Sequence, residues 1–368
     1  MRAIFTISLL LLLLNGCALF SKQKSNDIPF RLLNNHILLP VKVNGKSMEF
    51  VLDTSAQHTH LLTSEHSQAT EAEVDSVAIG NLPIPLHKTD SKHPHNNYHS
   101  YIAGIVGQDL FKHKILEINY DTQRITLHPP RLFDKGIKSA NEHWSTMPLK
   151  TKGQQWIIEM PLTLGKQSQY FEFALDTGFN QDFLFSKEEL GEALTPLYSY
   201  ITPYLDVDGH QEFEVYPLDR TYLGAHAIIW PLINTPLNDV PDKQISNVHP
   251  IGKVGNAVLS RFNLIIDVQR DTLYYQENQR HHVKNLPDRS GLTITPHPQG
   301  AKVTSVTAKA TDLLQINDVI QSYETVDINQ NTFDGFRLML SSEAERMWIC
   351  WLRDNERQCG HLEMGYRM

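Results

Sequence analysis

The chain has 368 residues, of which 41% are hydrophobic and 20% charged, a composition typical of soluble globular proteins and a length that fits two or three folded units. Its formal net charge of −8 at pH 7, without a long basic run, argues against nucleic-acid binding. Only the extreme N-terminus is apolar enough to enter a membrane.

The N-terminus has the pattern of an export signal. Arg2 precedes an apolar stretch over residues 3–14 that includes six consecutive leucines, and small residues follow before Cys17. The stretch is short for a permanent transmembrane helix, which is the alternative interpretation. Cleavage of a signal peptide, residues 1–16, is therefore favoured.

Residues 14–17 (LNGC) resemble a bacterial lipobox, although Asn15 is unusual there. The resemblance implies that Cys17 becomes the lipidated first residue of the mature protein. It also implies a membrane-anchored lipoprotein of the cell envelope that faces the periplasm. Residues 17–27 are then a linker to the folded part.

An internal repeat organises the middle of the chain. Residues 40–55 (PVKVNGKSMEFVLDTS) and 161–178 (PLTLGKQSQYFEFALDTG) share one order of elements. Each predicts an alternating strand, a glycine-containing turn, a second strand, and then Asp-Thr with a small residue.

Two further pairs of segments repeat in the same order. Residues 107–127 match 255–275 without a gap, and each predicts a short helix and a hairpin; residues 78–81 match 222–225. The repeats predict a mainly β fold with two pseudo-symmetric, β-barrel-like lobes. Lobe 1, the linker and lobe 2 span residues 28–135, 136–144 and 145–283.

Asp53 and Asp176 stand at equivalent ends of the repeated strands. One Asp-Thr-Gly turn alone is ordinary turn chemistry, but two in matched repeats are expected to face each other across a pseudo-twofold axis. Two facing carboxylates share a proton, so that one activates water while the other donates to a carbonyl oxygen. This arrangement suits peptide-bond hydrolysis without a covalent intermediate.

The motifs at 53–56 (DTSA) and 176–178 (DTG) resemble the active-site motifs of aspartic peptidases, nearest to bacterial retropepsin-like proteins fused as two lobes. The resemblance covers roughly residues 35–280. It implies an aspartic-type endopeptidase that acts on peptides or proteins and needs no cofactor, with Asp53 and Asp176 as the catalytic pair.

The resemblance also implies residues that support this pair. Thr54 and Thr177 would lock the two loops together by mutual hydrogen bonds. Residues 105–107 and 253–255 match the hydrophobic-glycine element beneath each aspartate and end at Gly107 and Gly255.

Two residues beside the carboxylates depart from the family pattern. Ser55 stands where glycine is usual and where the second motif has Gly178, so backbone strain is expected there. Phe179 stands where a small residue is usual. The competing hypothesis is therefore a catalytically inactive envelope lipoprotein that binds peptides in the same cleft.

A mobile flap is expected over the cleft. Residues 206–211 predict a hairpin tip in lobe 2, with Asp208, Gly209 and His210 as its candidate residues. Residues 57–75 leave little room for an equivalent hairpin in lobe 1. An asymmetric cleft is therefore expected.

The pattern changes from about residue 285, where a small α+β domain over 285–368 is expected. Residues 291–294, 301–306 and 313–320 resemble parts of a PDZ domain, which implies capture of a C-terminal peptide by strand addition. The full Gly-Leu-Gly-Phe loop is missing. A degenerate domain that only packs against the lobes is the alternative.

Cys350 and Cys359 flank a predicted hairpin turn at 353–356. In an exported protein such a pair predicts a disulfide between adjacent strands, and two free buried thiols are the alternative.

The 18 histidines raise the question of a metal, especially His58 and His60 beside the first aspartate, and a polar loop with four more: His87, His93, His95 and His99. No spacing matches a known zinc signature, so no metal is predicted. Signatures of serine hydrolases, phosphate-binding loops and metal hydrolases are absent from the sequence as well.

Overall fold

The computed structural model describes most of the chain after its N-terminus. The described residues are 27–62, 74, 76–87, 102–131, 144–164, 167–185, 200–206, 209–237, 252–284, 288–306, 313–329, 332–342 and 344–364. Strands dominate these ranges, so the mainly β prediction is confirmed. None of their helices is long and apolar enough to cross a membrane. The export signal and Cys17 lie outside the described residues.

The first repeat forms a sheet in the order β5-β8-β4-β3-β6-β7, with β2 beside β3. Its strands are β2 (Arg31–Leu33), β3 (His36–Val43), β4 (Lys46–Leu52), β5 (His60–Leu61), β6 (Val77–Ile79), β7 (Leu82–Pro83) and β8 (Ile102–Val106). Asn44 and Gly45 both have positive φ, 48° and 81°, as a two-residue hairpin turn between β3 and β4 requires. Strand β4 is buried at its end because β3 and β8 flank it.

The second repeat forms a longer sheet in the order β16-β17-β20-β15-β21-β14-β13-β18-β19, with β12 beside β13. Its strands are β12 (Lys150–Lys152), β13 (Gln155–Leu164), β14 (Gln167–Asp176), β15 (Phe183–Leu184), β16 (Tyr200–Asp206), β17 (Gly209–Pro217), β18 (Arg220–Leu223), β19 (His226–Ile229), β20 (Leu232–Pro236) and β21 (Gly252–Gly255).

The two sheets repeat one topology. In each, a hairpin (β3 with β4, or β13 with β14) ends at an aspartate, and a later strand (β8 or β21) returns parallel to the second strand of that hairpin. The registers agree: Leu52 pairs with Val106 in the first sheet, and Leu175 pairs with Val254 in the second. Both aspartates therefore reach the same place in their repeats.

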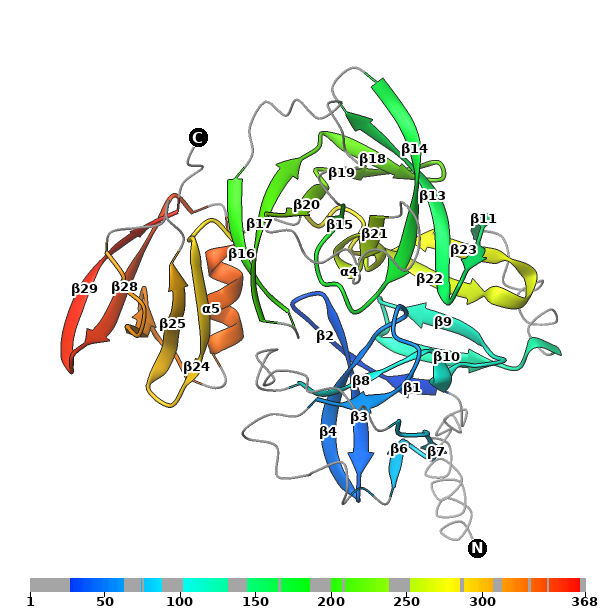
Figure 1. The fold of residues 1–368 in the computed structure, drawn as a ribbon, viewed down its shortest axis with the longest axis horizontal. Coiled ribbons are helices and arrows are strands. Elements are labelled where there is room, and N and C mark those ends of the chain that lie inside the picture. The colour runs from blue at the N-terminus through cyan, green and yellow to red at the C-terminus, as the bar shows by residue number, and fades with distance from the viewer. Residues whose placement is uncertain are drawn as a thin grey trace, which may run out of the picture.

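A third sheet joins the repeats in the order β1-β10-β9-β22-β23-β11. Its strands are β1 (Asp27–Pro29), β9 (Ile115–Asn119), β10 (Arg124–His128), β11 (Ser145–Pro148), β22 (Phe262–Asp267) and β23 (Thr272–Glu277). Ile118 of β9 pairs with Leu264 of β22, and these strands lie between the blue and the green parts of Figure 1. One core cluster contains Phe50 and Phe173, each fully buried. Each such phenylalanine stabilises the fold by about 1.5–3 kcal/mol.

The C-terminal part is a separate antiparallel sheet in the order β24-β25-β26-β28-β29, with β27 beside β26 and one helix, α5 (Phe333–Leu340). Its strands are β24 (Leu292–His297), β25 (Gly300–Val306), β26 (Val319–Tyr323), β27 (Val326–Asp327), β28 (Arg346–Arg353) and β29 (Glu356–Glu363). It has its own buried core and lies beside β16 (Figure 1).

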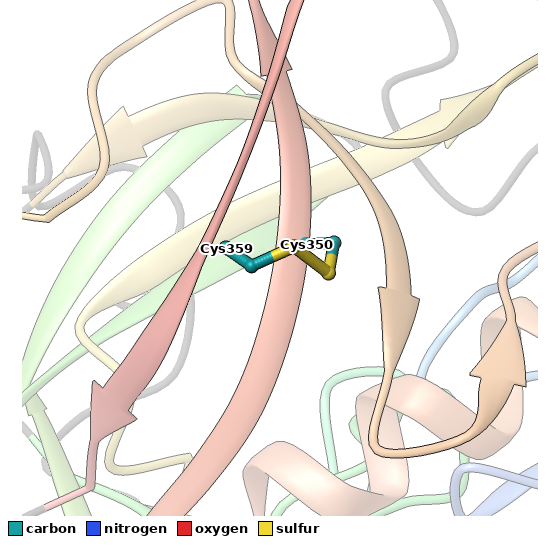
Figure 2. The surroundings of a disulfide bond; sticks show 2 residues. All are labelled: Cys350 and Cys359. Atoms are coloured by element: carbon teal, nitrogen blue, oxygen red, sulfur yellow. A yellow bond between two sulfur atoms is a disulfide. The ribbon is translucent and has the colours of Figure 1, made fainter.

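The two cysteines of this part lie directly opposite each other on β28 and β29. The structure joins Cys350 and Cys359 by a disulfide with a Cα–Cα distance of 4.1 Å (Figure 2). Because the bond links two strands of one hairpin, it fixes the register of that hairpin.

Candidate active site

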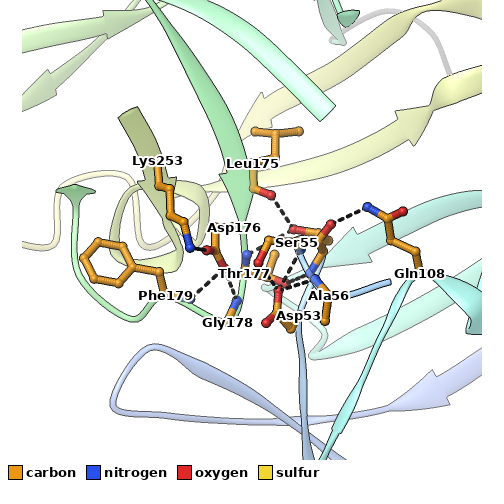
Figure 3. A network of polar contacts seen from close by, with 11 residues as sticks. Asp53, Ser55, Ala56, Gln108, Leu175, Asp176, Thr177, Gly178, Phe179 and Lys253 are labelled. Carbon is orange, nitrogen blue, oxygen red and sulfur yellow. Dashed lines mark hydrogen bonds and ion pairs between the residues drawn. The ribbon is translucent and has the colours of Figure 1, made fainter. Parts of the chain in front are cut away.

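Asp53 and Asp176 occupy matching turns at the ends of β4 and β14. The backbone N–H of Asp53 donates to the carbonyl oxygen of Val106 at 2.9 Å, and Asp176 pairs with Gly255 on β21. Each carboxylate is thus carried by a central strand that is held by the parallel strand beside it. Figure 3 shows the two turns next to each other.

Each turn holds its carboxylate by backbone N–H groups. Oδ1 of Asp53 accepts from the N–H of Ser55 at 2.7 Å and of Ala56 at 3.0 Å. Oδ1 of Asp176 accepts from the N–H of Gly178 at 3.0 Å and of Phe179 at 2.9 Å. The hydrogen-bonding pattern of one turn repeats in the other.

Two buried threonines lock the turns together. The backbone N–H of Thr54 donates to Oγ1 of Thr177 at 3.1 Å, and the N–H of Thr177 donates to Oγ1 of Thr54 at 3.1 Å. The hydroxyl of Thr54 donates to the carbonyl oxygen of Leu175 at 2.8 Å, and that of Thr177 to Leu52 at 2.7 Å. Four hydrogen bonds between repeats fix the two carboxylates relative to each other.

Gly178 shows how closely the turns approach. A Cβ atom on this residue would lie 2.6 Å from Cγ and 2.7 Å from Oδ2 of Asp53. No side chain fits at that distance. The carboxyl group of Asp53 therefore lies directly against the loop that carries Asp176.

The surroundings separate the pKa values of the two carboxylates. Burial, and then the negative charge of Asp176, raise the pKa of Asp53 to about 6. Burial also acts to raise the pKa of Asp176, but the ammonium of Lys253 and the N–H of Phe179 outweigh it and hold that pKa below its ordinary value. At mildly acidic pH, Asp53 carries the proton and Asp176 the charge.

Lys253 is a site residue that the sequence pattern did not reveal. Its Nζ lies 2.8 Å from Oδ2 of Asp176, which is buried. Residues 253–255 match a hydrophobic-glycine element, and the register of the parallel strands makes Lys253 equivalent to Ile105 in lobe 1. The available signal was a charged residue where the first repeat has an apolar one.

The segments that follow Gly107 and Gly255 support the turns from below. The backbone N–H of Gln108, the first residue of the 3₁₀ helix η2 (Gln108–Leu110), donates to the carbonyl oxygen of Ala56 at 2.8 Å. The N–H of Asn256, the first residue of α4 (Asn256–Leu259), donates to Phe179 at 2.7 Å. The two glycines are needed because a Cβ at either would meet the backbone of the loop above it.

Ser55 and Phe179, the two residues expected to disturb the site, leave the carboxylate contacts in place. The expected strain at Ser55 is wrong, because Ser55 is not among the described non-glycine residues with positive φ. Its hydroxyl instead donates to Oδ1 of Asp53 at 2.7 Å. The side chain of Phe179 is buried in an apolar cluster with Phe213, Val215 and Leu232.

The flap candidate is the hairpin of β16 and β17, which pairs as far as Asp206 and Gly209. Gly209 and His210 open β17, and Asp208 lies outside the described residues. Phe213 and Val215 of β17 join the cluster that surrounds Phe179. The base of this hairpin is therefore packed against the turn of Asp176.

Comparison with known proteins finds similarity among solved structures alone. No family model and no curated protein matches the chain. A crystal structure of a retropepsin-like aspartic protease from Rickettsia conorii matches with 18% identity and a TM-score of 0.27, and the match covers 36% of this chain and 92% of that chain. A match this limited does not bear on the activity of this chain, and no comparison supports the PDZ-like interpretation of residues 285–368.

Proposed function

We propose that this protein is an aspartic-type endopeptidase in which Asp53 and Asp176 activate water. The observation that carries the proposal is the interlocked pair of Asp-Thr turns, where two repeats hold two carboxylates against each other with pKa values shifted in opposite directions. Such a separation distinguishes the acid from the base in a catalytic pair.

The protonation states assign the roles. Asp176 takes a proton from the attacking water while Asp53 donates its proton to the carbonyl oxygen of the peptide, which gives a tetrahedral diol. Asp176 then delivers its proton to the amide nitrogen, and Asp53 recovers a proton from a hydroxyl of the diol as the C–N bond breaks. Water and amide are consumed, acid and amine are formed, and the dyad returns to its starting state.

A second candidate function is peptide binding without catalysis. The observation that favours it is the ion pair of Lys253 and Asp176, because the ammonium occupies Oδ2 of the carboxylate that would activate water. An ammonium at that oxygen lowers the basicity of Asp176 and competes with the water for the same acceptor.

The test is digestion of a mixed peptide library between pH 3 and pH 8 by the wild-type protein and by Asp53→Asn and Asp176→Asn. The matched control is Asp271→Asn, outside the site at a left-handed φ of 50° that asparagine also tolerates. Cleavage lost in both site variants and kept in the control supports the endopeptidase. If the wild type binds peptides but cleaves none of them at any pH, the endopeptidase proposal is wrong and the binding function takes its place.

We further propose that Cys17 anchors the protein to a membrane of the cell envelope, facing the periplasm, and that the C-terminal part binds an extended C-terminal peptide in the manner of a PDZ domain. The lipobox-like residues 14–17 support the anchor, and the PDZ-like segments from residue 291 onward support the binding. Fractionation of cells that produce Cys17→Ala tests the anchor: wild-type protein in the soluble fraction would contradict it. Titration with matched peptides that have either a free C-terminal carboxylate or an amidated C-terminus tests the binding.

A further inference from the structure

A second cluster of chemically active side chains lies beside the turn of Asp53. His58, His87 and Asp109 each direct a ligand atom into one small volume, where these atoms all lie within 4.8 Å of one another. The imidazoles of His58 and His87 stack with their centroids 3.9 Å apart, and Nε2 of His87 lies 3.8 Å from Oδ2 of Asp109. The three residues are far apart in the sequence, so no short sequence motif predicts that they meet.

Thr59 holds the segments that carry all three residues. Its N–H donates to Oδ2 of Asp109 at 2.8 Å and its hydroxyl donates to Oδ1 at 2.7 Å. Its carbonyl oxygen accepts from the N–H of His87 at 3.0 Å, and it directly follows His58. Thr59 is itself fully buried. Contacts of this kind orient ligands in metal sites.

The donor set suits a divalent transition metal. Two imidazoles and one carboxylate, with a coordination position left for water, are ligands of Zn²⁺ and of neighbouring first-row metals. Bond lengths of about 2.0–2.2 Å place tetrahedral ligand atoms roughly 3.3 Å apart, so the present separations need only small rotations. His58 and His87 are exposed and free to make them, while Asp109 is largely buried.

We propose that His58, His87 and Asp109 form a binding site for a divalent transition metal such as Zn²⁺, with solvent as a further ligand. The site lies close to the proposed dyad but does not depend on it. His58 follows Asp53 by one short loop, and its backbone packs against Gly107. Asp109 belongs to η2, whose Gln108 side chain donates to the carbonyl oxygen of Thr54 at 2.8 Å. A bound metal would join the loop after Asp53 to the helix that supports it.

The test is titration of the purified, untagged protein with Zn²⁺ by calorimetry at pH 7.5, and with Co²⁺ followed by its visible absorption. We expect one strong site per chain, weakened at least tenfold in His58→Ala and in His87→Ala. His113→Asn is the matched control, because His113 is exposed, belongs to lobe 1, and has a left-handed φ of 63° that asparagine adopts. It should bind as the wild type does.

The chain has other histidines, including His93, His95 and His99 outside the described residues. Affinity unchanged in the double variant His58→Ala/His87→Ala would assign binding to them and overturn the proposal. So would the absence of binding at about 1 mM Zn²⁺, which corresponds to a very weak site. Asp109→Asn gives a second measurement: it should retain the fold by circular dichroism and lose the Co²⁺ spectrum.

Discussion

Lys253 and Ile105 occupy the same position in the two repeats, and only Lys253 reaches a carboxylate. Its Nζ lies 2.8 Å from Oδ2 of Asp176, while Ile105 pairs with Val51 beside the strand end that carries Asp53. The two turns are alike in their backbone hydrogen bonds, so this side chain is the main source of their electrostatic difference. It breaks the twofold symmetry of the pair and assigns the negative charge to Asp176.

Replacing the lysine by the residue of the other repeat tests this assignment. In Lys253→Ile the pKa values of both Asp176 and Asp53 should rise, because the ammonium lowers both. A neighbouring opposite charge lowers a carboxyl pKa by about 1–3 units, so both limbs of the pH–activity profile should move up by on the order of one pH unit. Lys253→Arg keeps the charge and should move them little. A profile that stays in place in Lys253→Ile would contradict the assignment.

The pKa of Asp53 also predicts a dependence of stability on pH. The folded state, with a pKa of about 6, holds the proton more tightly than the unfolded state, with an ordinary value near 3.8. Stability therefore falls as pH rises from about 4 to about 6, and the cost of the ionised carboxylate persists above that. Asp176, whose pKa is lowered, contributes in the opposite sense at more acidic pH.

Asp53→Asn removes that cost, because the amide is uncharged and its oxygen can still accept from the turn. We expect the variant to unfold at a higher temperature than the wild type at pH 7.5, by a stability gain on the order of 2 kcal/mol, and to show little difference at pH 4. Thermal unfolding at both pH values measures the stability difference between the variant and the wild type, with Asp271→Asn as the control. An equal effect at the two pH values would exclude the raised pKa as the cause.

The features that sequence could predict are local ones. Alternating apolar residues predict the strands, and Asp-Thr with a small residue predicts a turn at a strand end, so finding the pattern twice was enough to expect Asp53 and Asp176 in equivalent places. The direction of the Lys253 side chain depends on the parallel pairing of β21 with β14, which joins residues about 80 apart. The strain expected at Ser55 was wrong because the backbone has no positive φ at this place, either at Ser55 or at the equivalent Gly178 of the second repeat. The cluster of His58, His87 and Asp109 forms only when three distant segments meet at Thr59.

Gly178 should be among the least replaceable residues of the site. In Gly178→Ala the new Cβ meets the carboxyl group of Asp53 at 2.6 Å, so that group must move out of its position against the other turn. A displacement of about 1 Å at a reacting group costs on the order of 100-fold in rate. We expect such a loss in kcat with a nearly unchanged circular dichroism spectrum.

The control for this variant is Gly45→Asn. Gly45 has open space around it and a left-handed φ of 81° that asparagine tolerates better than most residues, so the variant should keep wild-type activity. If Gly178→Ala were equally active, the carboxyl group of Asp53 could not be held where the structure places it.

The threonine lock makes a prediction about stability that is independent of catalysis. Thr177→Val preserves the shape of the side chain but leaves the N–H of Thr54 and the carbonyl oxygen of Leu52 buried without their partner. An unsatisfied buried group costs about 1–3 kcal/mol, so the variant should lose roughly 2–4 kcal/mol in denaturant unfolding. Thr146→Val, at an exposed position of β11, should lose far less.

The double variant Thr54→Val/Thr177→Val separates a lock from two independent contacts. Each hydroxyl accepts from the N–H of the other threonine, so the two residues belong to one network and their effects should not add. We expect a coupling energy of about 0.5–3 kcal/mol from the double-mutant cycle. Strict additivity would mean that each hydroxyl stabilises only the strand end to which it donates, Leu175 or Leu52, and that the two turns are held together by other contacts.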